Sequence, residues 1–190
     1  MTGPDVRRLF LALWPNATVR DALGEVQQRI TSGTGRAVSR DNLHITLVFL
    51  GSTAAERRAC IEQALDRVKI PGFTLQLDQL GYWRKPQVLW AGGDTVPAPL
   101  SALVEEAVAA AARCGTRLDV RPFHPHLTLF RKVRKPPRHL PVVAPILWPA
   151  DSFAMVESVT AAGGVCYKVL KTWTLVSTAA DSASGQQSVG

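Results

Sequence analysis

The feature that most constrains the fold of this chain is a four-residue phrase, His-x-Thr-Leu, that occurs twice. Residues 42–51 read NLHITLVFLG and residues 123–131 read FHPHLTLFR, which places His44 and His126 82 positions apart in the same local sequence. Both phrases lie in short apolar runs rich in β-branched and aromatic residues, which predicts β-strands. Two of the four histidines in the chain therefore occupy equivalent strands.

Alternation of side chains gives each of these predicted strands two different faces. His44 and Thr46 point to one side and the neighbouring leucines to the other, and His126 and Thr128 are separated from their leucines in the same way. A polar face on an apolar strand is unfavourable when it is buried without partners. We therefore expect the two strands to border one wet cleft, with both histidines and both threonines around it.

The order of the remaining elements indicates the fold class. Strands are predicted at 7–13, 43–50, 73–80, 88–92, 126–130, 152–161 and 165–177, and helices after Asn16, from residue 53 and from Pro99. Several strands follow one another directly, which excludes a doubly wound parallel sheet and predicts an α+β fold with largely antiparallel sheets. A strand and then a helix precede each of the two histidine strands, and this repeated order suggests two similar lobes.

Segments with little periodic pattern mark the domain limits. Residues 132–150 contain five prolines and predict a loop or extended linker. The small, polar stretch 179–190 predicts a disordered tail, so that residues 1–178 form a single bilobed domain. No run of about 18 apolar residues occurs, and the first apolar run resembles a strand more than a signal peptide, so we expect a cytoplasmic protein.

The net charge and the cysteine spacing limit which partners and which stabilising sites this chain is expected to have. Lys and Arg outnumber Asp and Glu by 22 to 15, a net charge of +7, which fits either an anionic partner such as nucleic acid or plain solubility. Five of the basic residues fall at 131–138, directly after the second phrase. The three cysteines are widely spaced without a CxxC motif, so neither a zinc ribbon nor a disulfide framework is expected.

Two histidines and two threonines around one volume suit phosphodiester chemistry without a metal. Imidazole titrates near neutral pH, so one ring can remove a proton while the other supplies one. The hydroxyls of Thr46 and Thr128 can donate hydrogen bonds to the phosphate oxygens, where negative charge accumulates in the transition state. A single His-x-Thr on a strand is more often structural, and it is the repetition that favours catalysis.

A metal site is the competing functional interpretation. His is a common metal ligand, and His124 could add a third imidazole. Neither phrase contains Asp, Glu or Cys, however, and two histidines are too few for a zinc site. We therefore expect no metal and no cofactor.

The two phrases resemble the signature of the 2H phosphoesterase superfamily, and in particular the RNA 2′,3′-cyclic phosphodiesterases, also called 2′-5′ RNA ligases. The likeness runs in order through RLFLALWP, SRDNLHITLVFLG, GYWRKPQVLWAG, RPFHPHLTLFRK and MVESVTAAGGVCYKVLKTWTL, or about residues 7–176. It implies a bilobed fold in which two antiparallel sheets, related by pseudo-twofold symmetry, flank a central cleft with helices outside.

The resemblance also implies an activity and residue roles. The reaction is metal-independent hydrolysis of RNA 2′,3′-cyclic phosphate ends to 2′-phosphomonoesters, with reversible 2′-5′ joining of RNA ends as a related activity. His126 resembles the proton acceptor and His44 the proton donor, whereas Thr46, Thr128 and Arg131 resemble phosphate-binding residues. No membrane and no obligate protein partner is implied.

Several residues beside the phrases are ambiguous. Strict alternation places Arg131 on the leucine face, so that it reaches the cleft only if the strand bulges, twists or ends there. The same alternation places Phe130 on the histidine face, where it could stack on a base, and Phe49 in the core. Tyr82 and Trp83 lie in a polar loop and are further candidates for base stacking.

Two alternatives remain open on the sequence alone. One is a 2H enzyme that acts on a small cyclic nucleotide, such as ADP-ribose 1″,2″-cyclic phosphate. The other is a non-catalytic RNA-binding module with structural histidines. The sequence does not identify the biological RNA, the oligomeric state or the role of ligation, and the near-identity of the phrases leaves donor and acceptor unassigned apart from the resemblance.

Overall fold

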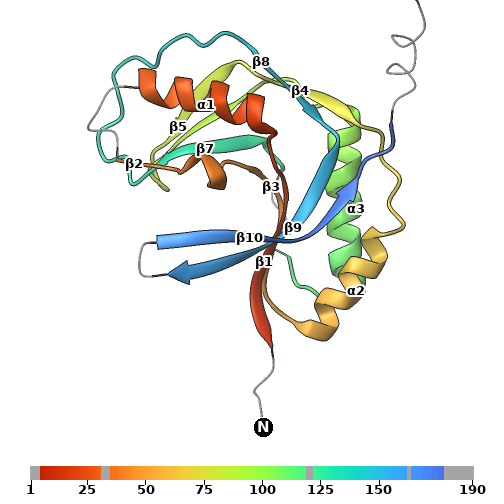
Figure 1. Ribbon diagram of the computed structural model, residues 1–190. Helices are drawn as coiled ribbons and strands as arrows, with labels where there is room; N and C mark the ends of the chain where they lie inside the picture. The colour runs from red at the N-terminus through yellow and green to blue at the C-terminus, as the bar shows by residue number, and fades with distance from the viewer. Residues whose placement is uncertain (1–4, 31–34, 119–121, 162–163, 178–190) are drawn as a thin grey trace, which may run out of the picture.

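The computed structural model describes residues 5–30, 35–118, 122–161 and 164–177, and Figure 1 shows the arrangement of its elements. The predicted disordered tail, 179–190, lies outside the described residues. The helices are α1 (Ala17–Arg29), α2 (Ala55–Leu65) and α3 (Ala98–Arg113), with a 3-10 turn η1 (Arg40–Asn42). The strands are β1 (Val6–Leu13), β2 (Arg36–Ala37), β3 (Ile45–Ala54), β4 (Phe73–Leu77), β5 (Gln79–Trp83), β6 (Val88–Gly92), β7 (His126–Arg131), β8 (Ile146–Ala150), β9 (Ser152–Ala161) and β10 (Gly164–Thr174).

The main sheet consists of two halves that meet at one residue pair. The strand order is β10-β9-β1-β3-β7-β6-β5, with β2 paired to β7, and every one of these strand pairs is antiparallel. β3 and β7 contact through a single pair, Ile45 with Leu127, so the sheets of the two lobes join there. β4 and β8 form a separate antiparallel pair. The predicted α+β class with antiparallel strands is confirmed.

Three details of the element order differ from the sequence prediction. The expected strand 73–80 divides at Asp78 into β4 and β5, which belong to different sheets. The short β2 was not predicted. The proline-rich segment 132–150 ends in β8, whose Pro149 is tolerated because its strand pairs on only one side, with β4.

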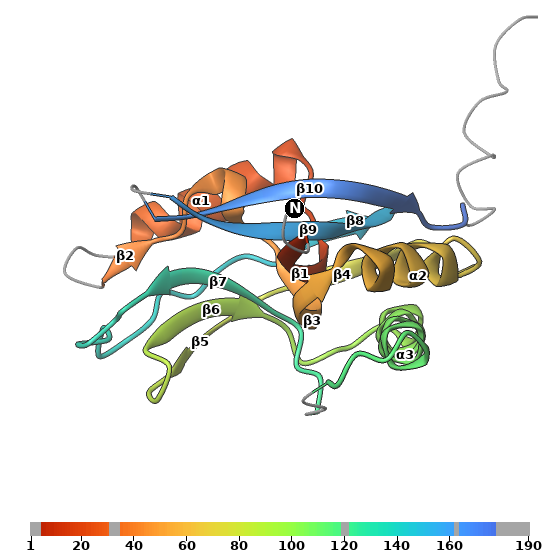
Figure 2. The same ribbon diagram turned by 90° about the horizontal axis from the view of Figure 1, so that it is seen from below.

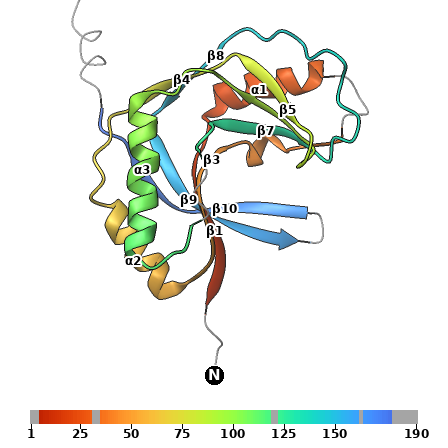
Figure 3. The ribbon, with the colours of Figure 1, turned by 180° about the vertical axis from the view of Figure 1, so that it is seen from behind.

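The helices cover one face of the main sheet. α2 and α3 lie together on one side of it, as Figure 3 shows from behind. β1 divides its side chains accordingly: Leu9, Leu11 and Leu13 are buried in the main core, whereas Phe10 and Ala12 belong to a small cluster on the opposite face. The face of the sheet that carries Phe10 is therefore the one available to a site.

Both histidine strands contain a bulge at the same position, three residues after the histidine. In β3, Leu11 pairs with Val48 and Ala12 with Thr46, so Leu47 has no partner across β1. In β7, Leu89 pairs with Phe130 and Trp90 with Thr128, so Leu129 is the extra residue. A bulge inserts one residue and shifts the alternation of the side chains that follow.

Two predictions that assumed strict alternation were wrong because of these bulges. Phe49, expected in the core, is 70% exposed, because the bulge at Leu47 turns it outward. Phe130, expected on the histidine face, is 8% exposed and packs in the main core, because the bulge at Leu129 turns it inward. The carbonyl of Leu129 accepts hydrogen bonds from the Gln27 side-chain amide of α1 and from the Val38 N–H, each at 2.9 Å.

The prediction about cysteines was wrong in one respect. Cys60 of α2 and Cys114, which follows α3, form a disulfide, with Cα atoms 5.9 Å apart. The two residues are 54 positions apart, and only the packing of α2 on α3 brings them together, which sequence spacing does not reveal. None of the helices in the described ranges is both long and apolar enough to cross a membrane.

Candidate active site

The register of the central strand pair determines how the two phrases meet. Ile45 pairs with Leu127 between antiparallel strands, and continuing that register by one residue on either side would set His44 opposite Thr128 and Thr46 opposite His126. His44 and His126 would be diagonal neighbours in this register. The charge of His126 helps to lower the pKa of His44, so the two rings lie within electrostatic reach of each other. We call the face of β3 and β7 that carries these four residues the histidine face.

A backbone carbonyl orients each imidazole in the same way. Nδ1 of His44 lies 2.7 Å from the carbonyl oxygen of Asn42, and Nδ1 of His126 lies 2.8 Å from that of His124. A carbonyl oxygen can only accept, so each Nδ1 carries the proton and donates it. Each Nε2 therefore remains for proton transfer, and the two histidines are equivalent in this respect.

The surroundings of His44 are aromatic and dry. Its ring centroid lies 5.0 Å from that of Phe10, 5.2 Å from that of Trp14, with which it stacks at 5°, and 4.9 Å from that of Tyr167, at 83°. The residue is only 9% exposed. Burial lowers the pKa of His44 to about 4, although the hydrogen bond to Asn42 opposes the shift.

His126 is the more open of the two histidines. Its ring meets Trp83 edge to face, with centroids 4.4 Å apart, and the residue is half-buried. Burial is also the main cause that lowers the pKa of His126, and the nearby His124 and Arg131 add to it by repulsion. The two imidazoles thus share a hydrogen-bonding pattern but differ in their access to water.

Arg131 reaches the histidine face, which strict alternation did not allow. The bulge at Leu129 returns the exposed Arg131 to the side of His126 and Thr128. Its positive charge lowers the pKa of both His44 and His126, which places the guanidinium within electrostatic reach of each ring. Phe49 holds the corresponding position in β3, five residues after its histidine.

The threonines are partly buried beside the histidines and have unused hydroxyl groups. Across the ranges that the structure describes, neither Thr46 nor Thr128 hydrogen-bonds to a protein group through its side chain. A hydroxyl on a wet face, next to a neutral imidazole and a guanidinium, is suited to donate to an anionic oxygen.

The residues predicted to stack on bases have different positions. Trp83 lies beside His126, as a stacking role requires. Tyr82, in contrast, packs against the main core, and its hydroxyl donates to the carbonyl of Val133 at 2.7 Å. Phe130 is in the core, so only Trp83 of the three remains available.

Sequence reasoning missed the aromatic residues around His44. Phe10 and Trp14 come from the first strand and its end, and Tyr167 comes from β10, which reaches the site only through the strand order β10-β9-β1-β3. Alternation in RLFLALW separates Phe10 from the leucines, and this was the one available signal. Within the described part of the chain, no three His, Cys, Asp or Glu side chains gather as metal ligands do.

Comparison with known proteins identifies the family of this chain. The profile of the family described as LigT-like phosphoesterase matches residues 13–90. A protein named RNA 2′,3′-cyclic phosphodiesterase from Escherichia coli (strain K12) is 36% identical over 172 residues, which cover 89% of this chain and 97% of that protein. One of the same name from Thermus thermophilus is 33% identical, covering 88% of this chain and 90% of the relative.

Solved structures give the same result. The crystal structure of E. coli LigT complexed with 3′-AMP superimposes with a TM-score of 0.85 at 34% identity, covering 90% of this chain and 99% of that one. The crystal structure of TT0787 of Thermus thermophilus superimposes with a TM-score of 0.75 at 29% identity, covering 88% and 97%. The resemblance inferred from the two histidine phrases is thus confirmed, and the chain belongs to the LigT-like phosphoesterase family of the 2H superfamily.

Proposed function

We propose that this protein hydrolyses RNA 2′,3′-cyclic phosphate ends to 2′-phosphomonoesters by acid–base catalysis, without a metal. The observation that carries the proposal is the pairing of Ile45 with Leu127, because continuing its antiparallel register would turn both histidines and both threonines to one face. Two hydroxyl donors and two titratable rings would then be available to one phosphate group. The names of the similar proteins from E. coli and T. thermophilus support the same substrate class.

In the proposed reaction, Nε2 of His126 accepts a proton from water as the water oxygen attacks phosphorus. The bond between phosphorus and the 3′ oxygen breaks, and Nε2 of His44 donates a proton to that oxygen. Thr46 and Thr128 donate hydrogen bonds to the non-bridging oxygens, and Arg131 supplies positive charge as negative charge develops. The products are a 2′-phosphate and a free 3′ hydroxyl.

The same steps allow 2′-5′ joining as a secondary activity. A 5′ hydroxyl of a second RNA replaces water, gives its proton to His126 and attacks phosphorus. The 3′ oxygen again leaves with a proton from His44, so that a 2′-5′ phosphodiester forms in place of the phosphomonoester. Hydrolysis dominates in water, because water is present at far higher concentration than an RNA end.

The role of His44 as the donor requires that substrate binding protonates it. Burial keeps this imidazole neutral at pH 7 in the free protein, with a pKa of about 4. A phosphate anion beside Nε2 favours the charged form of the ring and raises its pKa. Because His126 is more open, it needs no such change to act as the acceptor of a proton from water.

A modified substrate separates the two roles. A substrate whose 3′ oxygen is replaced by sulfur has a leaving group that needs no proton, so loss of the donor matters little. We expect the thio substrate to restore most of the activity lost in His44→Ala and little of that lost in His126→Ala. The reverse pattern would exchange the two roles and leave the overall reaction unchanged.

The central experiment offers adenosine 2′,3′-cyclic phosphate to the protein and identifies the product isomer by 31P NMR. We expect 2′-AMP, and a loss of about 10²–10⁴ in turnover for His44→Ala and for His126→Ala. Unchanged turnover in both variants would favour the non-catalytic RNA-binding module. Preference for ADP-ribose 1″,2″-cyclic phosphate over any RNA end would favour the small-nucleotide enzyme.

Binding and location complete the proposal. Trp83, beside His126, and the exposed Phe49 offer aromatic surfaces on which a nucleobase can stack. We place the activity in the bilobed domain 1–178 and the protein in the cytoplasm. A reducing cytoplasm would open the Cys60–Cys114 bond, so the thiol state of these residues in cells tests the location directly.

A further inference from the structure

We propose that the basic end of the second lobe binds the RNA strand that carries the cyclic phosphate, so that the preferred substrate is an RNA chain rather than a mononucleotide. This inference rests on the proposed function. The surface concerned, which we call the basic rim, consists of five exposed residues from two segments that are distant in sequence. They are Arg84, Lys85, Lys132, Arg134 and Lys135.

Hydrogen bonds hold the two segments of the basic rim together. The turn between β5 and β6 and the segment that follows β7 lie at the same end of the sheet (Figure 2). The N–H of Val133 donates to the carbonyl of Gln87 at 3.0 Å, and the Tyr82 hydroxyl donates to the carbonyl of Val133 at 2.7 Å. Val133 itself is fully buried, so the lysines and arginines on either side of it are presented from a fixed backbone.

Close packing by β2 supports the same segment from its other side. A Cβ atom on Gly35, at φ +92, would lie 2.9 Å from the carbonyl group of Lys132, so the chain can approach this closely only with glycine. β2 then pairs with the end of β7 through Arg36 and Arg131. The segment that carries Lys132 is therefore held against the end of the sheet by backbone packing and pairing.

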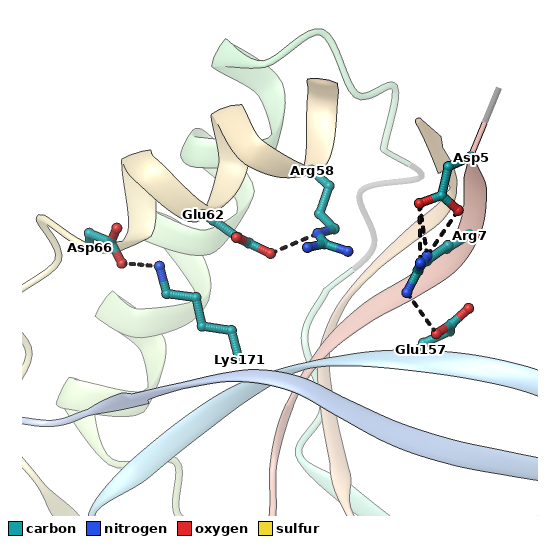
Figure 4. A network of polar contacts seen from close by, with 7 residues as sticks. All are labelled: Asp5, Arg7, Arg58, Glu62, Asp66, Glu157 and Lys171. Carbon is teal, nitrogen blue, oxygen red and sulfur yellow. Dashed lines mark hydrogen bonds and ion pairs between the residues drawn. The ribbon is translucent and has the colours of Figure 1, made fainter. Parts of the chain in front are cut away.

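The rim has no acidic counterpart nearby in sequence. Residues 79–93 and 122–150 contain no Asp or Glu. Ion pairs occur in other parts of the molecule. Figure 4 shows Arg7 with Asp5 and Glu157, Arg58 with Glu62, and Lys171 with Asp66, and Arg40 pairs with Asp21.

An uncompensated cluster of positive charge is unfavourable for the free protein and favourable for a polyanion. Solubility alone would be served equally well by a mixture of positive and negative charges. The rim instead collects five cations on one edge of a chain whose net charge is +7. Its chemistry fits the phosphates of a nucleic acid strand.

The rim is continuous with the histidine face. Arg131 directly precedes Lys132, and its charge acts on both catalytic histidines. Trp83 directly precedes Arg84, and its ring contacts His126. Gly92, opposite His126, lies four residue steps along β6 from Val88 at the turn, which is about 13 Å. A cyclic phosphate held at the histidines thus leaves the preceding nucleotides beside the rim.

The test compares two charge-matched variants on two substrates. The rim variant is K85Q/K132Q/R134Q/K135Q, and the control is R57Q/R67Q/K69Q/R113Q, whose residues are exposed on α2, α3 and the segment after α2. Each removes four positive charges and takes the net charge from +7 to +3. The substrates are adenosine 2′,3′-cyclic phosphate and a single-stranded ten-nucleotide RNA with a 2′,3′-cyclic phosphate end, each at 50 and 200 mM KCl.

For the wild type we expect a KM for the RNA well below that for the mononucleotide. The rim variant should raise the RNA KM about 10- to 100-fold at 50 mM KCl and make its salt dependence shallower by up to about 3 in log KM per log salt. Its activity on the mononucleotide should stay within twofold of wild type, and the control variant should change neither substrate.

Other results would overturn the inference. Equal KM values for the two substrates in the wild type would show that nothing beyond the terminal nucleotide is bound. An equal rise of the RNA KM in the rim and control variants would show that net charge alone, and not the position of the charges, affects RNA binding. Absence of hydrolysis of both substrates by the wild type would instead refute the proposed function, so the two failures are distinguishable.

Discussion

Burial of His44 as a neutral imidazole makes the stability of the fold depend on pH in a predictable way. Its pKa is lowered from 6.5 to about 4, mainly by desolvation among the aromatic rings. Above pH 6.5 the ring is neutral in both the folded and the unfolded chain, so it contributes no pH dependence. Below pH 6.5 the imidazole of His44 is protonated in the unfolded chain, whereas in the folded chain it stays neutral down to about pH 4. The unfolded chain therefore binds more protons in this window, and folding stability falls as the pH falls across it.

The magnitude follows from the difference of about 2.5 pKa units. At about 1.4 kcal/mol per unit, the wild type should lose about 3 kcal/mol of unfolding free energy between pH 7.5 and pH 4 because of His44, most of it by pH 4.5. Urea unfolding curves at a series of pH values measure this loss. A stability of about 5–15 kcal/mol is typical of a domain of this kind, so the effect is large enough to resolve.

The matched control is His44→Gln, which keeps a polar side chain but cannot titrate. This variant should show the pH dependence of the other acidic and basic groups only, and the difference between the two curves isolates His44. NMR titration of the imidazole resonances gives the pKa of His44 directly and independently. Parallel stability curves for wild type and His44→Gln would refute the burial argument, and with it the claim that substrate must protonate this ring.

Three further predictions concern other parts of the molecule. Reduction of the Cys60–Cys114 bond should lower the unfolding free energy by up to about 4 kcal/mol, because the bond closes a loop of 54 positions, and Cys60→Ser should remove the response to reductant. Gly81→Ala should reduce kcat/KM about tenfold, because the added methyl group collides with the Trp90 ring, which supports Trp83 beside His126. A chelator should leave turnover unchanged, and loss in EDTA with recovery on adding a metal would revive the metal interpretation.

Much of the fold followed from local patterns. Apolar periodicity located the helices, and Asn16 caps α1 by accepting a hydrogen bond from the N–H of Val19 at 2.9 Å. The duplicated phrase identified the two central strands and the residues on their polar faces. These features depend on near neighbours in the chain, so sequence alone carries them.

The predictions failed where neighbouring strands decide the outcome. Phe49, Phe130 and Arg131 were assigned by strict alternation, but each lies beyond a bulge that exists only in the pairing with β1 or β6. Tyr167 joins the site because β10 pairs with β9 and β9 with β1. No window of sequence around either histidine contains this information.

The bulges also give the two nearly identical phrases different neighbouring side chains. Each phrase is followed, after an equivalent bulge, by one side chain that returns to the histidine face: Phe49 in the first and Arg131 in the second. An aromatic ring can stack on a base but adds no charge, whereas a guanidinium stabilises a phosphate. The local symmetry supplies two equivalent imidazoles. In the function that we propose, the residues that break this symmetry would serve different parts of the substrate: Phe49 would offer a ring for stacking, and Arg131 would offer a charge to the phosphate.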